Sequence, residues 1–269
     1  TVDGGDNRIG GRYTTDTPDL RIDGDFTVAA GAQFFTGPYS PNRIDFYGAF
    51  TVGNGSAIGI NNNTSDGGYW NLAGATSISL QGVTIRYMTN NWQWNVPRWN
   101  FGAASITLAN TNTFNLEQDV VNVARDGVAS RGALQQSISN TISGTGGIAK
   151  TGAATLILDN AANSYSGATT ISEGILQVYG GGAIGDLSAV TLADVQTNAN
   201  EGSVRTTLSL NDSETIGSLA GGGATGGNVI LNGNTLTVGG NDSSTSYGGV
   251  IAGSATGATQ VVSLGTGSP

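Results

Sequence analysis

The chain has 269 residues, nineteen acidic side chains against ten basic ones, and neither cysteine nor histidine. The absence of cysteine and histidine excludes disulfides, thiolate nucleophiles, imidazole acids and bases, and zinc sites with nitrogen or sulfur ligands. A formal charge of −9 is opposite in sign to what phosphate neutralisation requires, so nucleic acid is not an expected partner.

The composition also indicates where the protein works. Glycine supplies 44 residues, yet 38% of the chain is hydrophobic, so a packed core can form. No apolar run is long enough for a transmembrane helix, and we expect no membrane insertion by this chain. The single lysine and the abundant small polar residues are typical of secreted proteins, so the expected location is extracellular.

Near the amino terminus, charged residues alternate along a predicted strand. Alternation places them on one face, and clustered carboxylates beside a basic residue are what polysaccharide-degrading β-helix enzymes use. The same alternation is equally typical of a solvated polar face. We therefore expect a non-enzymatic protein, with a polysaccharide-degrading enzyme as an alternative. The four residues are Asp19, Arg21, Asp23 and Asp25.

Short β-branched runs follow along the chain, separated by Gly-Asn, Asn-Gly and Gly-Gly pairs. Each run alternates apolar and polar residues, which predicts a strand with one buried face. Such strands fit a sandwich, a barrel or a solenoid. Inexact recurrence of residues 112–116 at 234–238, and of 140–146 at 249–255, favours stacked coils. The runs are Ser77–Ile85, Ala104–Leu108, Thr155–Leu158, Gly174–Val178, Thr207–Leu210 and Val229–Val238.

Residues 85–101 form the most aromatic segment and hold three of the four tryptophans. Aromatic and arginine side chains at a surface are typical of binding to a glycan, a protein or a second subunit. The alternative is a cap over the open end of the solenoid, or a place in the core. The loss of aromatic and basic residues after this region divides the chain into an aromatic part, 1–131, and a glycine-rich part, 132–269. The candidate contact residues are Tyr87, Trp92, Trp94, Arg98, Trp99 and Phe101.

Residues 144–178 carry the most specific pattern. Lys150 is followed by the phrase Asn163-Ser-Tyr-Ser-Gly and then by Gly174-Ile-Leu. This spacing closely resembles the autotransporter-associated β-strand repeat, also called the passenger-associated transport repeat. The resemblance implies a right-handed parallel β-helix on a secreted bacterial protein at the cell surface, and it does not imply an enzyme.

The repeat can also be interpreted physically. We expect Thr155–Leu158, Thr170–Ser172 and Ile175–Val178 to form three faces of one coil, with glycines at the corners. Tyr165 is expected to cover a corner edge. Lys150 either reaches an acceptor such as Asp159 or is solvated, which is the commoner state of a lone lysine. The structural residues of the repeat are Gly147, Lys150, Gly152, Asn163, Tyr165, Gly167 and Gly174.

The expected fold is all-β: an elongated right-handed parallel β-helix, or solenoid, with an amino-terminal cap as an option. The expected function is structural, as a stalk that projects from the bacterial surface or a subunit that polymerises there through unpaired strand edges, head to tail. Adhesion to a glycan or a cell-surface protein through residues 85–101 is the alternative. The chain is expected to be either a fragment of a longer passenger or a free subunit. No cofactor is expected; calcium is the one plausible ion, and no residue is assigned to it.

Overall fold

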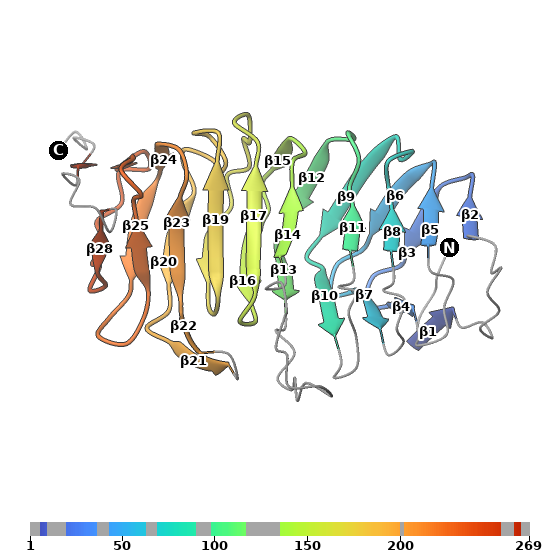
Figure 1. The fold of residues 1–269 in the computed structure, drawn as a ribbon. Coiled ribbons are helices and arrows are strands. Elements are labelled where there is room, and N and C mark those ends of the chain that lie inside the picture. Colours follow the sequence, from blue (N-terminus) through green and yellow to red (C-terminus); the bar gives the residue numbers. More distant parts are fainter. Residues whose placement is uncertain are drawn as a thin grey trace.

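The computed structural model describes residues 6–9, 20–36, 43–62, 69–89, 98–116, 135–199, 202–253 and 261–264. Within these ranges the regular elements are all β-strands, and every strand pair except β21–β22 is parallel. Figure 1 shows the strands stacked in successive coils from one end of a rod to the other. In the described part of the chain, no helix could cross a membrane.

The first face of the rod is one continuous nine-stranded parallel sheet. In it, Gln33 pairs with Ala57 and Ala57 with Thr84, so the chain returns to the same face after each coil. In order, the strands are β1 (Asp6–Ile9), β4 (Gln33–Thr36), β7 (Ala57–Asn62), β10 (Thr84–Thr89), β13 (Thr111–Leu116), β16 (Gly147–Thr151), β18 (Thr169–Ile171), β20 (Ala189–Leu192) and β25 (Ser218–Gly221).

The second face consists of a four-stranded and a six-stranded parallel sheet. The buried side chain of Gln136 connects them: its Oε1 accepts a bond from the Trp99 N–H at 3.2 Å, and its Nε2 donates to the Trp99 carbonyl at 3.0 Å. The strands are β2 (Leu20–Ile22), β5 (Arg43–Phe46), β8 (Tyr69–Asn71) and β11 (Arg98–Asn100), then β14 (Gln135–Ile138), β17 (Thr155–Asp159), β19 (Ile175–Tyr179), β23 (Thr207–Leu210), β26 (Asn228–Ile230) and β28 (Ile251–Ala252).

The third face begins as a five-stranded sheet and ends as a three-stranded one. Between them, residues 163–166 and 182–185 take the place of strands, and the N–H groups of Ser164 and Ser166 bond to the carbonyls of Ile142 and Gly144. The strands are β3 (Phe26–Val28), β6 (Ala49–Val52), β9 (Ser77–Gln81), β12 (Ile106–Ala109) and β15 (Ile142–Gly144), then β24 (Glu214–Ile216), β27 (Thr235–Val238) and β29 (Val261–Leu264). The antiparallel hairpin β21 (Gln196–Ala199) and β22 (Gly202–Arg205) interrupts one coil.

This architecture confirms the expected all-β parallel solenoid and four of the six predicted strands. The right-handed winding is what the resemblance implies and what parallel crossover connections prefer. Two details were wrong. The runs Ser77–Ile85 and Val229–Val238 each form two strands on different faces instead of one strand. Thr155 pairs with Ile175, so these two runs lie on the same face of successive coils instead of on two faces of one coil. The recurring phrases 112–116 and 234–238 also lie on different faces, in β13 and β27.

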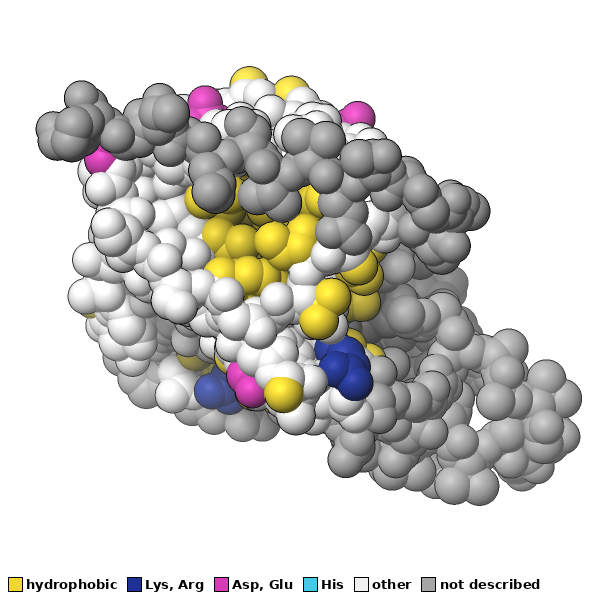
Figure 2. All heavy atoms as spheres, turned by 90° about the vertical axis from the view of Figure 1, so that its left-hand side faces the viewer, with side chains coloured by type: hydrophobic (Ala, Val, Ile, Leu, Met, Phe, Trp, Pro, Cys, Tyr) yellow, Lys and Arg dark blue, Asp and Glu magenta, His cyan; other side chains and the backbone are white. Residues whose placement is uncertain are grey.

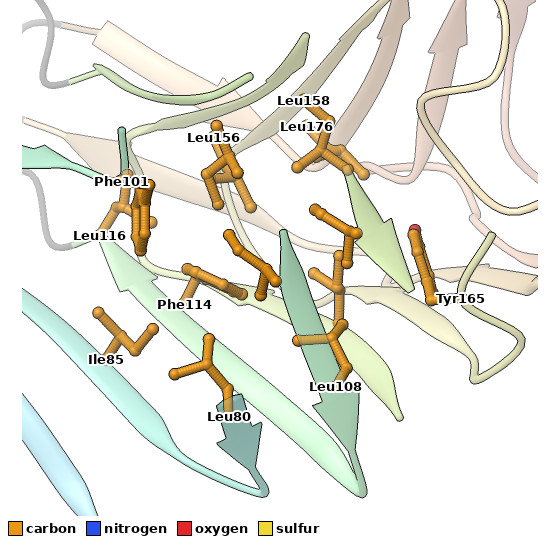
Figure 3. Close-up of a cluster of buried hydrophobic side chains, with 14 of the residues drawn as sticks. Leu80, Ile85, Phe101, Leu108, Phe114, Leu116, Leu156, Leu158, Tyr165 and Leu176 are labelled. Atoms are coloured by element: carbon orange, nitrogen blue, oxygen red, sulfur yellow. The ribbon is translucent and has the colours of Figure 1, made fainter. Parts of the chain in front are cut away.

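The core lies between the three faces. Alternation builds it: in β6, Phe50 and Val52 are buried while Ala49 and Thr51 point outward. Figure 3 shows inward side chains of several coils, among them Leu80, Leu108 and Leu156, meeting in the interior. Figure 2, which looks onto the end that carries β28, shows hydrophobic side chains at the centre surrounded by polar side chains and backbone.

From β3 to β13 the core is built around aromatic rings. The Trp70 ring is 5.2 Å from Phe34, 5.7 Å from Phe46 and 4.4 Å from Trp99, measured between ring centroids. Such tilted and edge-on contacts add to the free energy gained from burying the rings. The buried aromatic side chains among the described residues of the first half therefore cluster in the interior of these coils.

Candidate functional site

Lys150, the lysine of the repeat, is fully buried in β16. Its Nζ donates to the carbonyls of Thr151, Gly152 and Glu173 at 2.9, 2.5 and 3.1 Å. An ammonium has three N–H donors, so these carbonyls match the charged form. Burial lowers the pKa of Lys150 to about 7, and the negative charge of Glu173 opposes this shift. The expectation of a solvated lysine was wrong, because the acceptors are backbone carbonyls in two successive coils.

The glycines of the repeat make room for this arrangement. Gly152 and Gly174 have φ angles of 76° and 74°, in the left-handed region that favours glycine, and both lie beside the Lys150 ammonium. A Cβ on Gly174 would lie 2.4 Å from the Gly152 carbonyl oxygen. Gly147 and Gly167 face backbone of the neighbouring coil so closely that a Cβ at either position would lie 2.3 Å from it. These glycines thus permit close stacking of the coils.

Asn163 connects three successive coils through one buried amide. Its Oδ1 accepts a bond from the Ile142 N–H at 2.8 Å, and its Nδ2 donates to the Ala183 carbonyl at 2.8 Å. The two partners are 21 residues before and 20 residues after Asn163. The side chain therefore replaces ladder hydrogen bonds where the third face lacks regular strands.

Tyr165 lies in the interior, where Figure 3 places it at the edge of the hydrophobic cluster. Its hydroxyl shares a 2.8 Å hydrogen bond with Thr169, whose Oγ1 lies 2.9 Å from the hydroxyl of Ser188. Burial raises the pKa of Tyr165. The expectation that this ring covers a corner edge was wrong, since the ring is buried in the core and its hydroxyl belongs to a buried network.

Other buried polar side chains also bond to the backbone of neighbouring coils, and these roles were not predicted from the sequence. Glu214 accepts bonds from the Ala183 and Ile184 N–H groups at 3.1 and 3.3 Å, and burial raises its pKa to about 7. Asn112 accepts from two successive N–H groups, those of Gly82 and Val83. The available signal was a polar residue at an inward position of an alternating strand, as in β13.

The candidate contact residues of segment 85–101 are not gathered at one described surface. The side chains of Trp99 and Phe101 are only 4% and 3% exposed and stack 5.7 Å apart in the core. They are therefore unavailable to a partner of the folded chain, because the coil encloses them. Trp92 and Trp94 lie outside the described residues. For Tyr87 in β10 and Arg98 in β11, only the backbone is described.

The alternating charged side chains near the amino terminus that the structure describes contact residues of their own coil or of the next one. The Arg21 Nε lies 2.5 Å from Asp23 Oδ1, with both side chains largely exposed, and the Arg21 guanidinium lies 4.1 Å from the centre of the Tyr47 ring. Asp25 accepts the N–H of Ala49 in the next coil at 2.9 Å. Asp19 lies outside the described residues. Among the described residues, no three acidic side chains are placed to hold a metal ion.

Comparisons with known proteins agree with this geometry. Residues 148–178, which contain Lys150 and Asn163, match the model of the passenger-associated-transport-repeat family. Over 123 residues, or 45% of this chain, the sequence is 40% identical to the adhesin BmaC autotransporter of Brucella suis biovar 1 (strain 1330). The match spans 3% of that protein's length, and no solved structure matches the chain. The chain is thus a parallel β-solenoid that contains a passenger-associated-transport repeat and is similar to a short part of an autotransporter adhesin.

Proposed function

We propose that this chain is a non-catalytic segment of a surface-displayed bacterial passenger, and that its solenoid is a stalk that holds other parts of the protein away from the cell. One observation carries the proposal. In the repeat, the most distinctive polar side chains, Lys150 and Asn163, bond to the backbone of neighbouring coils instead of facing a ligand.

The similarity to part of an autotransporter adhesin supports the surface location. A stalk needs every coil to transmit load to the next one. Parallel ladders on three faces, together with buried side-chain bonds between coils, meet this need.

The test is a display experiment in a bacterium with long surface polysaccharide. A short epitope is placed at the outer end of a passenger, with or without this chain between the epitope and the translocating domain. We expect the epitope to become accessible to antibody only when the chain is present, because the stalk lifts it through the polysaccharide layer. Equal accessibility with and without the chain, at equal amounts of displayed protein, would contradict the proposal.

Adhesion is a second candidate because the similar protein is named an adhesin. If the chain itself binds, beads coated with it should attach to cultured animal cells or to immobilised glycans. The proposed contacts are Trp92 and Trp94, so replacing both by alanine should abolish attachment, whereas replacing Tyr39, an aromatic outside segment 85–101, should not. Attachment that survives the double replacement would exclude Trp92 and Trp94 as the binding contacts.

A further inference from the structure

A phenylalanine, a glycine and an arginine form a column on the outside of the first face. The register of β4, β7 and β10 aligns Phe35 with Gly59 and Gly59 with Arg86 on neighbouring strands (Figure 1). The residue before each of them in its strand is buried, so by alternation the column lies on the outer side of the sheet. We call these three residues the Phe-Arg column.

Gly59 makes room for the ring of Phe35. A Cβ at position 59 would lie 3.1 Å from Phe35 Cε1 and 2.7 Å from the Arg86 carbonyl oxygen. The ring therefore takes the space that a side chain would fill there, and Gly59 itself is buried. Glycine inside a strand often marks a place where another group approaches the backbone closely. Phe35 remains partly exposed, so a flat apolar surface faces solvent at this point.

Arg86 differs from the other exposed arginines whose side chains the structure describes. Arg21 lies beside Asp23, and Arg205 donates to the Thr225 carbonyl. Within the described part of the chain, no hydrogen bond, ion pair or ring contact engages the guanidinium of Arg86. Its five N–H donors are therefore available to another molecule, and their planar arrangement matches a carboxylate through two parallel bonds.

The strands around this column carry almost no negative charge. The strands of the first face from β4 to β25 contain no aspartate or glutamate. Asp6 lies in the edge strand β1, three strands from Arg86, and Arg8 of the same strand is in register with Phe35. The chain has a formal charge of −9, but exposed charges farther than ~8 Å are largely screened at physiological salt. An anion can therefore approach this part of the face.

We propose that the Phe-Arg column binds an acidic polysaccharide whose sugars carry carboxylates. The apolar side of a sugar ring would stack on Phe35, and the carboxylate would pair with the Arg86 guanidinium. The two residues are two strands apart, ~10 Å at the backbone, and the Phe35 ring extends over Gly59 into this interval. One sugar with its carboxylate thus reaches both side chains. The partly exposed hydroxyl of Thr84, also in β10, can bond to the sugar hydroxyls.

One aromatic ring and one arginine make a weak site for a single sugar. An exposed ion pair contributes little by itself, because water screens it. A polysaccharide repeats the same group many times, so a surface that displays many copies of the chain holds the polymer through many such contacts at once. The inference does not depend on the stalk function, because it concerns a lateral surface of the solenoid.

The first test measures how much fluorescent polygalacturonate, a carboxylated polysaccharide, is retained by beads densely coated with the chain in calcium-free buffer at physiological salt. We expect strong retention, and at least tenfold less retention of neutral dextran. Arg86→Gln should lower retention of polygalacturonate at least tenfold. The control Arg205→Gln removes an exposed arginine from another part of the rod and should leave retention unchanged. Equal loss in the two variants, or equal retention of the two polysaccharides, would overturn the proposal.

A second pair of variants tests the ring and leaves the charge intact. Phe35→Trp keeps an aromatic surface over Gly59, whereas Phe35→Leu keeps an apolar side chain without a ring. Circular dichroism establishes that equal amounts of folded protein are compared. We expect Phe35→Trp to retain polygalacturonate as well as wild type does, and Phe35→Leu to retain at least fivefold less. Wild-type retention by Phe35→Leu would overturn the proposal, because charge alone would then explain the binding.

The same beads separate this site from adhesion through Trp92 and Trp94. Replacing both tryptophans by alanine should leave retention of polygalacturonate unchanged, because the Phe-Arg column stays intact. If that replacement abolishes retention while Arg86→Gln does not, the polysaccharide binds elsewhere on the chain and the proposal is wrong.

Discussion

From β3 to β13 the interior of the solenoid holds a cluster of aromatic rings among aliphatic side chains, whereas from β16 to β27 it is mostly aliphatic, with Tyr165 as a buried ring, and is bordered by buried polar groups. The coils differ in length as well. Asn71 pairs with Asn100 in the aromatic half, 29 residues later, and Ile148 pairs with Thr169 in the aliphatic half, 21 residues later. The predicted boundary between residues 131 and 132 lies outside the described residues.

The difference shows two ways to close the same kind of coil. A longer coil forms a strand on each face and holds rings such as Trp70 in its interior. A shorter coil in the repeat lacks a strand on the third face, so its backbone groups bond to side chains such as Asn163 and Glu214. Because buried backbone groups must be paired, the shorter coil depends on specific polar residues.

The largest expected effect is on the aromatic half. Trp70→Ala removes a buried ring that contacts Phe34, Phe46, Phe50 and Trp99, and it should lower the free energy of unfolding by about 3–5 kcal/mol. Urea titration followed by circular dichroism measures this loss. Since coils contact mainly their neighbours, hydrogen exchange should accelerate from β5 to β11 before it changes near β19. If hydrogen exchange accelerates equally along the whole rod, the two halves do not depend on separate cores.

The corresponding change in the repeat is Lys150→Met. It keeps most of the side-chain volume but leaves three backbone carbonyls, one of them buried and two partly buried, without their donor, and it should cost about 3 kcal/mol. The control is Arg205→Met, which removes an exposed basic side chain that bonds to the Thr225 carbonyl. We expect the control to leave the urea midpoint unchanged. A Lys150→Met protein as stable as wild type would mean that the lysine does not hold the coils together.

A smaller loss of unfolding free energy is expected for the side-chain amides, and it should be greater for a buried amide than for an exposed one. Asn163→Ala removes the buried bonds to Ile142 and Ala183 and should cost about 2 kcal/mol. Asn160→Ala removes the exposed bonds to the Ser139 carbonyl and the Ala162 N–H and should cost about 0.5 kcal/mol or less. Thermal unfolding of both variants gives the comparison. Equal costs would show that exposed turns contribute as much as the interior of the third face.

The last expected effect depends on pH. The pKa of Glu214 is raised in the folded state to about 7 from an ordinary value of 4.5, so the folded chain binds the proton more tightly than the unfolded chain. The stabilisation from this group is full below about 4.5 and is lost as pH rises through about 7. We expect the difference in unfolding free energy between wild type and Glu214→Gln to fall over this interval. A difference that rises with pH would contradict the raised pKa.

The sequence by itself determined the strands and the stacking. The alternation in Ser77–Gln81 and Thr155–Asp159 depends only on neighbouring residues, and the spacing of Lys150, Asn163 and Gly174 identified the repeat. The positive φ of Gly174 could also be expected from the sequence, because glycine adopts this conformation more readily than any other residue.

Only the tertiary structure decided where the polar and aromatic residues of these coils lie. Lys150, Tyr165 and Trp99 have side chains that suit a surface, yet all three are buried. Some of their hydrogen-bond partners belong to other coils, such as Glu173 for Lys150 and Gln136 for the backbone of Trp99. A buried polar group is stable only when such partners are in place, and they meet only after residues more than twenty positions apart have stacked.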